Sequence, residues 1–379
     1  MNQETCDMKK IKICILGGGN IGTLLLADLS KNASVRLFTS KPDIWKNEIE
    51  VYDSNNNLKY VGYADIISNN PDKVVTDADI IISTLPSQIF PEIMSIIKPY
   101  INPKAWIGIM PGSGGNEFYL RSILRSDQVI FGFQRVHGIS RIKEYGSSVY
   151  DLGKKSELFI GSMPSNMAAS ISKKIESLIG IPCFPVPNYL SITLTPSNPI
   201  LHTSRLYSLF KDYRETVWNN MVLFYREWDD FASDTLIGAD QELQILCSKI
   251  DGLDLLHVKS LKEHYESKTS EQMTNKIRSI EAFKDIHSPM LKEGDKYIPD
   301  FNSRYFNEDF PYGLCIIKSF CHLAGVKTPI IDKILHWYES INDLEYYING
   351  EFVGKDLKKL LLPQNFGLCH IDDIVRFYS

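Results

Sequence analysis

The stretch IKICILGGGNIGTLLLADL, residues 11–29, decides the fold of the N-terminal part of this chain. Residues 11–16 form a short apolar run rich in β-branched side chains, which predicts a buried strand. Three glycines follow. From residue 21 onward, apolar side chains return every three or four positions, which predicts a helix. The predicted fold therefore begins with a strand, a glycine turn and a helix.

The glycine turn carries the first functional signal. Gly17, Gly19 and Gly22 fit the spacing G-x-G-x-x-G in the strand–turn–helix context that this motif requires. The first glycine permits a tight turn, the second lets a pyrophosphate approach the backbone, and the third lets the helix pack close to the strand. The helix N-terminus offers free N–H groups to phosphates. We therefore predict a dinucleotide site that also includes Asn20 and Ile21; a plain glycine turn is the alternative.

The second predicted strand, residues 35–39, bears on the choice of cofactor. NAD and FAD sites usually have an Asp or Glu at the end of this strand, where it binds the ribose hydroxyls. Here the chain continues as Ser40 and Lys41, which can offer a hydrogen bond and a charge to a 2′-phosphate. This pattern favours NADP(H) over NAD(H), although NAD(H) stays open and Lys41 can also be a plain surface lysine.

Further alternation of strands and helices follows. The predicted helix spans residues 91–97, and the predicted strands span residues 79–84, 106–110, 128–136 and 157–162. Such alternation predicts a parallel, doubly wound sheet of the Rossmann type. Ligands of these sheets bind beyond the carboxyl ends of the strands, so we expect Leu85, Pro86 and the glycine loop 112–115 near the cofactor.

The pattern changes after a proline-rich crossover at residues 181–199. We predict a Rossmann domain over residues 1–185 and an all-helical domain over residues 186–379. Apolar side chains spaced by three and four residues between Leu206 and Phe224 predict one long amphipathic helix. Two further stretches, residues 238–253 and 311–341, also show helical periodicity.

Composition limits the class of protein. The 379 residues carry a formal net charge of −5, and no basic run of the kind that binds nucleic acid is present. The apolar run near the N-terminus is too short for a signal peptide, and no stretch approaches the ~20 apolar residues of a membrane span. The seven cysteines form no CxxC pair and lack zinc spacing. We expect a cytoplasmic protein without a metal site.

The segment NPILH, residues 198–202, contains a histidine whose function its own sequence leaves open. Asn198 and Pro199 suit the start of a helix, so His202 lies about one turn inside it. A buried, hydrogen-bonded core histidine is the commoner interpretation of such a position. Proton transfer is the other.

The chain resembles the octopine/nopaline (opine) dehydrogenase family along most of its length. The matching features are GGGNIG at residues 17–22, NPILH at residues 198–202 and RYFNEDFPYGL at residues 304–314. The resemblance implies a Rossmann domain joined to a helical domain, with substrate bound between them. It also implies reductive condensation of an amino acid with a 2-oxo acid, such as pyruvate or 2-oxoglutarate, by NADH or NADPH, and the reverse oxidation.

The same resemblance implies functions for single residues. His202 would work with Asp309 as the catalytic pair, and Arg304 would hold a substrate carboxylate. The chemistry suits this set, because one imidazole can take the amine's proton and later help water to leave, while a carboxylate fixes its tautomer. Arginine can bind a carboxylate through two parallel hydrogen bonds. A helix cap for Asp309 and a surface charge for Arg304 are the alternatives.

Three more residues are predicted to contact substrate. FQRVHGISRIKEYG, residues 133–146, matches a family region that carries an arginine, so Gln134 and Arg141 are expected near the oxo acid, with Asn198 at the start of the NPILH helix. His137 and Gly138 depart from the family's pattern.

Two other functions share this fold. One is reduction of 2-oxo or 3-hydroxy acids, as in ketopantoate reductases, which depend on a lysine in the helical domain; no lysine here stands in a matching motif. The other is non-catalytic dinucleotide sensing. The expected partners are small molecules, neither nucleic acid nor membrane, and a homodimer is an option that the sequence leaves open.

Overall fold

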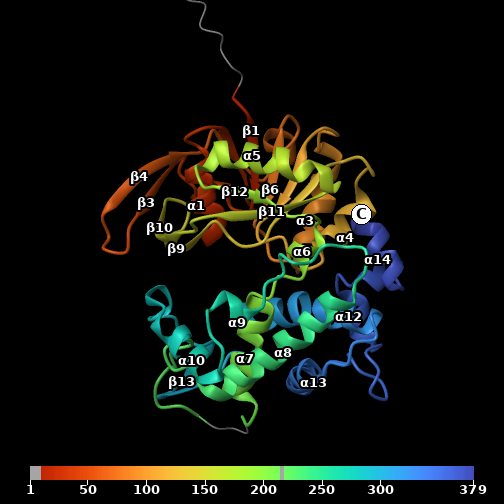
Figure 1. Ribbon diagram of the computed structural model, residues 1–379. Helices are drawn as coiled ribbons and strands as arrows, with labels where there is room; N and C mark the ends of the chain where they lie inside the picture. Colours follow the sequence, from red (N-terminus) through yellow and green to blue (C-terminus); the bar gives the residue numbers. More distant parts are fainter. Residues whose placement is uncertain (1–9, 214–216) are drawn as a thin grey trace, which may run out of the picture. The chain divides into compact units, whose positions relative to one another are not determined.

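A computed structural model describes residues 10–213 and 217–379, which form two compact units (Figure 1). The first unit takes the described residues up to Leu85, then Glu92–Gly112 and Ile123–Pro185; the second takes Pro86–Pro91, Ser113–Ser122 and the described residues from Val186 onward. The main junction thus lies between Pro185 and Val186. The two short segments fall in the sequence range predicted for the N-terminal domain, yet they group with the second unit.

An eight-stranded sheet forms the centre of the first unit (Figure 1). From one edge to the other, its strands are β12 (Cys183–Pro185), β11 (Leu158–Met163), β8 (Ile130–Phe133), β7 (Trp106–Ile109), β6 (Ile80–Ser83), β1 (Lys12–Leu16), β2 (Ser34–Phe38) and β5 (Ile66–Ser68). The six strands from β8 to β5 are mutually parallel. The Rossmann-type fold predicted for this half of the chain is confirmed.

One edge of the sheet departs from the predicted parallel arrangement. β11 runs antiparallel to β8, and β12 runs parallel to β11. A parallel return needs a crossover connection, usually a helix. Between β8 and β11 the chain instead forms the hairpin of β9 (Gly138–Glu144) and β10 (Ser148–Lys154), so the next strand enters the sheet in the opposite direction.

A second, four-stranded sheet was not evident from the sequence. Its order is β4 (Leu58–Tyr63), β3 (Glu48–Tyr52), β10 and β9. It is joined to helix α1 (Asn20–Leu29) through Asp28, whose carboxylate accepts hydrogen bonds from Tyr60 (2.6 Å) and Lys154 (2.5 Å). The buried Nε2 of His137 lies 3.3 Å from the same carboxylate. His137, which departs from the family's pattern, is therefore part of this buried cluster.

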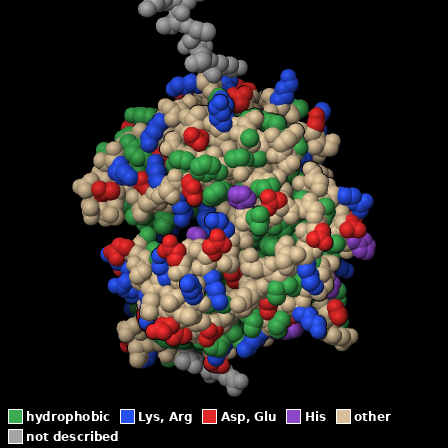
Figure 2. All heavy atoms as spheres, in the orientation of Figure 1, with side chains coloured by type: hydrophobic (Ala, Val, Ile, Leu, Met, Phe, Trp, Pro, Cys, Tyr) green, Lys and Arg blue, Asp and Glu red, His purple; other side chains and the backbone are tan. Residues whose placement is uncertain are grey.

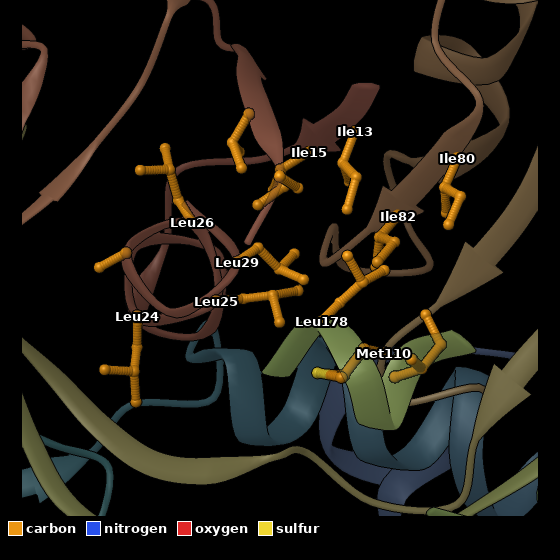
Figure 3. Close-up of a cluster of buried hydrophobic side chains, with 14 of the residues drawn as sticks. Ile13, Ile15, Leu24, Leu25, Leu26, Leu29, Ile80, Ile82, Met110 and Leu178 are labelled. Carbon is orange, nitrogen blue, oxygen red and sulfur yellow. The ribbon is translucent and has the colours of Figure 1, made fainter. Parts of the chain in front are cut away.

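The core of the first unit lies between the large sheet and two helices, α1 and α5 (Ala168–Ile179) (Figure 3). Isoleucines of β1 and β6 face leucines of α1, and Leu178 of α5 reaches the same layer. Burying one such side chain contributes ~1.5–3 kcal/mol. This packing fixes β1 against α1 and thereby positions the glycine turn that joins them. Two other helices, α2 (Pro71–Val74) and α3 (Phe90–Ile97), follow β5 and β6.

The second unit is helical, as predicted, apart from a small hairpin of β13 (Met290–Glu293) and β14 (Lys296–Pro299). Its helices are α4 (Asn116–Ile123), α6 (Leu190–Thr193), α7 (Asn198–Phe210), α8 (Asp230–Lys249), α9 (Leu261–His264), α10 (Ser270–Ser279), α11 (Arg304–Asp309), α12 (Cys315–Leu323), α13 (Pro329–Asn342) and α14 (Ile371–Tyr378). A π-turn, Phe310–Leu314, joins α11 to α12.

The long helix predicted to reach Phe224 is wrong. Helix α7 ends at Phe210, and residues 214–216 lie outside the described part of the chain. Trp218 then exchanges two backbone hydrogen bonds of 2.9 Å with Tyr297, and the N–H of Phe224 donates to the carbonyl of Ile286 at 2.7 Å. Trp218 and Phe224 therefore take part in long-range backbone pairings where the predicted helix would have continued.

The surface carries both signs of charge. On the face drawn in Figure 2, acidic and basic side chains are interspersed over each unit. Within residues 10–213 and 217–379, no helix combines the length and apolarity needed to cross a membrane.

Candidate active site

The glycine turn between β1 and α1 has the geometry expected of a phosphate cradle. Gly17 has a φ of +98°, and a Cβ on Gly22 would come within 2.0 Å of the Gly17 carbonyl, so a side chain at either position would be strained. A Cβ on Gly19 would meet no atom within 4 Å. The backbone at Gly19 therefore faces open space, as close approach of a pyrophosphate requires.

The N-terminus of α1 is also suited to an anion. Gly19 stands at the cap position, no side-chain cap occupies this end, and the first turn contains no acidic residue. Its unpaired N–H groups and the helix dipole would favour a phosphate. The Asn20 side chain accepts the N–H of Ile142 at 2.7 Å, which ties the helix start to β9. Thus the predicted turn residues fit a bound dinucleotide.

The end of β2 presents two polar side chains. Ser40 and Lys41 follow the strand after one buried residue, Thr39, and both are exposed. Arg36, on the strand itself, is buried and pairs with Asp77, whose pKa it holds below its usual range. Arg36 is thereby committed to the sheet, which leaves Ser40 and Lys41 as the groups that could meet a ribose 2′-phosphate.

The segment after β6 contains the other predicted cofactor residues. A Cβ on Gly17 would lie 2.8 Å from Cδ2 of Leu85, so Leu85 adjoins the glycine turn within the first unit. Pro86 begins a segment of the second unit. The glycine loop is divided in the same way, with Gly112 in the first unit and the residues from Ser113 in the second.

The two motifs of the second unit pack directly against each other. A Cβ on Gly313 would come within 2.9 Å of Cβ of Pro199, so only glycine allows this approach of the π-turn to the start of α7. Pro199 occupies the first turn of α7, where its lack of an N–H costs nothing. The contact brings Asp309, the last residue of α11, toward His202, one turn inside α7.

His202 and Asp309 form a hydrogen-bonded pair. Nδ1 of the imidazole lies 2.8 Å from Oδ2 of the carboxylate, although the residues are 107 positions apart in the chain. The side chains are 10% and 13% exposed, respectively. A carboxylate can only accept a hydrogen bond, so Nδ1 carries the proton and Nε2 is left as the basic nitrogen.

A third side chain completes this arrangement. The hydroxyl of Tyr225, a residue that is 4% exposed, lies 2.8 Å from Nε2 of His202. The ring of Tyr305 contacts the imidazole at 4.8 Å between centroids, and that of Phe224 at 5.6 Å. Tyr225 was not predicted from the sequence, because the spacing of apolar residues from Leu206 to Phe224 predicted a long helix at this position.

A second carboxylate beside Asp309 holds the loop that follows β6. Oε1 of Glu308 accepts the N–H of Ser87 at 2.8 Å, and the Ser87 hydroxyl accepts the Asn116 amide at 2.9 Å. Burial raises the pKa of Glu308. Glu308 was not predicted from the sequence, although its position next to Asp309 in the EDFPYG motif was an available signal.

The predicted substrate residues lie in both units. Arg304 is exposed at the start of α11, and Asn198 is exposed four residues before His202, on the same face of α7. Gln134 and Arg141 belong to the first unit. Gln134 follows β8, whereas Arg141 is exposed on β9 and donates to the Ser140 carbonyl at 2.9 Å.

The six cysteines in the described part of the chain are all free. Among the same residues, no group of three or more histidine, cysteine or acidic side chains could hold a metal ion.

Both parts of the chain are similar to known dehydrogenases. The model of the α-helical domain of NAD/NADP octopine/nopaline dehydrogenases matches residues 185–342, and that of the N-terminus of NAD-dependent glycerol-3-phosphate dehydrogenase matches residues 12–114. Tauropine dehydrogenase of Arabella iricolor is 28% identical over 401 residues, covering 96% of this chain and 100% of that protein. Octopine dehydrogenase of Pecten maximus is 26% identical over 394 residues, covering 96% and 98%.

A solved structure of octopine dehydrogenase with NADH and L-arginine has the same fold. Its TM-score is 0.85 at 24% identity, over 97% of this chain and 98% of that one. A dinucleotide turn followed by this helical unit defines an NAD(P)-dependent oxidoreductase that acts on CH–NH groups. More particularly, the chain is similar to the octopine/nopaline dehydrogenases, whose α-helical domain matches residues 185–342.

Proposed function

We propose that the protein condenses the amino group of an amino acid with a 2-oxo acid, pyruvate or 2-oxoglutarate, at the expense of NADPH, and oxidises the resulting opine in reverse. The observation that carries this proposal is the hydrogen-bonded pair of His202 and Asp309. The names of the relatives favour the same chemistry, and octopine dehydrogenase has been solved with pyruvate as well as with L-arginine.

The pair can perform both proton steps of such a reaction. Nε2 of His202 accepts the proton that the ammonium group must lose before its nitrogen attacks the oxo carbon. The imidazolium is stabilised by Asp309 and returns the proton when the carbinolamine loses water. When bound, a reduced nicotinamide supplies the hydride that reduces the imine. Proton transfer of this kind typically contributes about 10²–10⁴-fold to the rate.

The substrate carboxylates need cationic and polar partners. Arg304 can bind one of them through two parallel hydrogen bonds, and Asn198 stands one turn before His202 on the same helix face. Gln134 and Arg141 are proposed partners of the oxo acid on the first unit.

The proposed preference for NADPH depends on Ser40 and Lys41. Both are exposed shortly after the end of β2, and neither carries the negative charge that would repel a 2′-phosphate. We also expect the protein to be cytoplasmic, an expectation supported by the free cysteines of the described chain.

Initial rates test the proposal. The protein is mixed with NADPH or NADH, with pyruvate or 2-oxoglutarate, and with each member of an amino acid panel, and the absorbance of the reduced cofactor is followed. We expect oxidation that requires both substrates and yields an N-(carboxyalkyl) amino acid, which mass spectrometry identifies.

Other outcomes would assign the chain differently. Oxidation of the cofactor by an oxo acid without any amine would favour a reductase of the ketopantoate type. Cofactor binding without turnover of any pair would favour a dinucleotide sensor.

A further inference from the structure

Two neighbouring carboxylates end helix α11, and they bind different partners. Oδ2 of Asp309 lies 2.8 Å from Nδ1 of His202, whereas Oε1 of Glu308 accepts the backbone N–H of Ser87 at 2.8 Å. Successive residues of a helix project about 100° apart, so one short helix can hold both contacts at once. All of these residues belong to the second unit. The end of α11 is therefore fixed between α7 and the segment Pro86–Pro91.

The Ser87 end of this contact is buried and closely packed. Ser87 is 4% exposed, and its hydroxyl accepts the side-chain amide of Asn116, which is 1% exposed, at 2.9 Å. A Cβ on Gly114, whose φ is +100°, would collide with that hydroxyl oxygen. Only glycine allows this approach of the loop to Ser87. Glu308 therefore binds a part of the backbone that has little room to move.

Helix α11 depends on tertiary contacts for its position. It has six residues, Arg304–Asp309, far fewer than the ~12–15 that an isolated helix needs in water. Ser303 stands at its N-cap without a side-chain cap hydrogen bond, and Phe306 is the one buried residue among the six. The hydrogen bond from the Ser87 backbone to Glu308 is consequently placed to set the rotation of α11, and with it the direction of the Asp309 carboxylate.

The charges around Glu308 are consistent with this separation of the two carboxylates. Burial raises the pKa of Glu308, hydrogen bonds from the backbone and side chain of Ser87 oppose that rise, and the charge of Asp309 adds to it. Arg304 lowers the pKa of Glu308. Burial, and then the charge of Glu308, raise the pKa of Tyr312. The hydrogen bonds from Ser87 thus hold the Glu308 carboxylate in place beside a neighbour that repels it.

We propose that Glu308 is a positioning residue, whose hydrogen bonds to Ser87 hold the Asp309 carboxylate where it accepts the Nδ1 proton of His202. The proposal rests on the proposed function, because it gives Glu308 a part in the same reaction. Glu308 transfers no proton itself and acts only through Asp309. Its loss frees the end of α11 to rotate and weakens the Asp309–His202 hydrogen bond. Less of the imidazole then has the tautomer with a basic Nε2.

The principal test is a double-mutant cycle of Glu308→Ala with Asp309→Ala. In the wild-type background, Glu308→Ala should lower kcat about tenfold, since misplacement of a catalytic group can cost up to ~10²-fold. In the Asp309→Ala background it should lower kcat less than about twofold, because the group that Glu308 positions is already gone. The acid limb of the kcat/KM profile should also move to lower pH in Glu308→Ala, because the imidazolium is held less well by its carboxylate partner. A tenfold fall in both backgrounds, or a single variant with wild-type kcat, overturns the proposal.

Two further variants of Glu308 test the hydrogen bond itself. Glu308→Gln keeps an acceptor oxygen for the Ser87 N–H and should retain kcat within about threefold. A loss as large as that of Glu308→Ala would contradict the proposed hydrogen bond. Glu308→Asp keeps the charge and shortens the side chain by one methylene group, so it should repeat the kcat and pH effects even if Glu308→Ala fails to fold. Wild-type behaviour of Glu308→Asp overturns the proposal.

A matched control removes another carboxylate that holds backbone N–H groups. Glu242 accepts those of Ile330 at 2.7 Å and Ile331 at 3.0 Å, at the start of α13. Glu242→Ala should lower the Tm without moving the acid limb of the kcat/KM profile. An equal shift of the acid limb in Glu242→Ala would mean that the effect of Glu308→Ala is a general loss of stability, which contradicts positioning.

A spectroscopic measurement separates this proposal from the proposed function. In protein labelled with ¹⁵N-histidine, the ring nitrogen resonances of His202, identified by their loss in His202→Ala, report which nitrogen carries the proton. The wild type should carry it on Nδ1, and Glu308→Ala should show less of this tautomer. Equal tautomer populations in the two proteins overturn positioning by Glu308 alone. Absence of turnover in the wild type overturns the proposed function, and the tautomer measurement still decides whether Glu308 positions Asp309.

Discussion

The nucleotide turn and the His202–Asp309 pair are built from the sequence in opposite ways. The turn lies within residues 11–29, and its strand, glycines and helix are neighbours in the chain. The pair joins residues 107 positions apart and depends on the close contact of Gly313 with Pro199. A site made of contiguous residues keeps its geometry through local packing, whereas a site made of distant residues depends on all the contacts that bring those residues together.

The largest effect is expected from substitutions in the His202–Asp309 pair, which leave the glycine turn of the nucleotide site unchanged. His202→Ala removes the proposed base, and Asp309→Asn removes the acceptor that would fix its tautomer, so each should lower kcat about 10³-fold. The Kd of NADPH, measured by fluorescence titration, should stay within about threefold.

The matched control is His322→Ala, which removes a half-buried histidine of α12 and should leave kcat unchanged. If the His202 and Asp309 variants weaken cofactor binding as much as they lower kcat, the pair and the nucleotide turn do not function independently of each other.

A second prediction concerns another contact between distant residues. Burial raises the pKa of Glu117, on α4, to about 7; its Oε1 accepts the hydroxyls of Thr193 (2.5 Å) and Tyr378 (2.7 Å). Between the ordinary pKa of 4.5 and about 7, the folded state holds a proton that the unfolded state has lost. The free energy of unfolding should therefore fall as pH rises through this window, and Glu117 should contribute up to roughly 3 kcal/mol of that fall.

Urea unfolding at several pH values between 4.5 and 8 measures this contribution. Glu117→Gln keeps a neutral side chain at all pH values, so its stability curve should be flatter than that of the wild type. Glu271→Gln, at an exposed position of α10, should reproduce the wild-type slope. Equal slopes for wild type and Glu117→Gln would mean that Glu117 is charged in the folded protein at neutral pH.

The difference between local and long-range contacts also explains which strands and helices could be predicted from the sequence. The strands β1, β2, β6, β7 and β8 follow from apolar runs, and the helix α1 follows from its 3.6-residue period, because each needs only its own residues. The strands β3, β4, β9 and β10 were missed. Exposed and buried residues alternate only weakly along β4, β9 and β10, whereas the alternation along β3 was a signal that could have been used.

The largest error has a related cause. Apolar spacing predicted one helix from Leu206 to Phe224, yet the chain after Phe210 forms backbone pairs with Tyr297 and Ile286. These partners lie far along the sequence, so the local spacing of apolar residues could not predict the pairings. The contact of Tyr225 with His202 was missed for the same reason, because the predicted helix would have excluded it.

A third prediction tests the nucleotide turn by adding a single methyl group at Gly19. A Cβ at Gly19 would meet nothing within 4 Å, so Gly19→Ala should leave the Tm nearly unchanged, while the added methyl group occupies the approach of the pyrophosphate. We expect the Kd of NADPH to rise about tenfold, equivalent to ~1.4 kcal/mol. Gly22→Ala should lower both Tm and affinity, since its Cβ would lie 2.0 Å from the Gly17 carbonyl. An unchanged Kd for Gly19→Ala would contradict the assigned cradle.

The smallest expected effect concerns the choice between the two nicotinamide cofactors. Lys41 is exposed after β2, so a charge-assisted contact with a 2′-phosphate remains partly screened by solvent. Lys41→Ala should therefore weaken NADPH binding about three- to tenfold, a loss of ~0.7–1.4 kcal/mol, while NADH binding changes little. Lys46→Ala, at another exposed lysine of the first unit, should affect the binding of neither cofactor.

Parallel titrations at two salt concentrations sharpen the test, because the loss of NADPH affinity should shrink as ionic strength rises. An equal effect of Lys41→Ala on both cofactors would mean that Lys41 contacts a group they share, and the preference for NADPH would then have to depend on Ser40 alone.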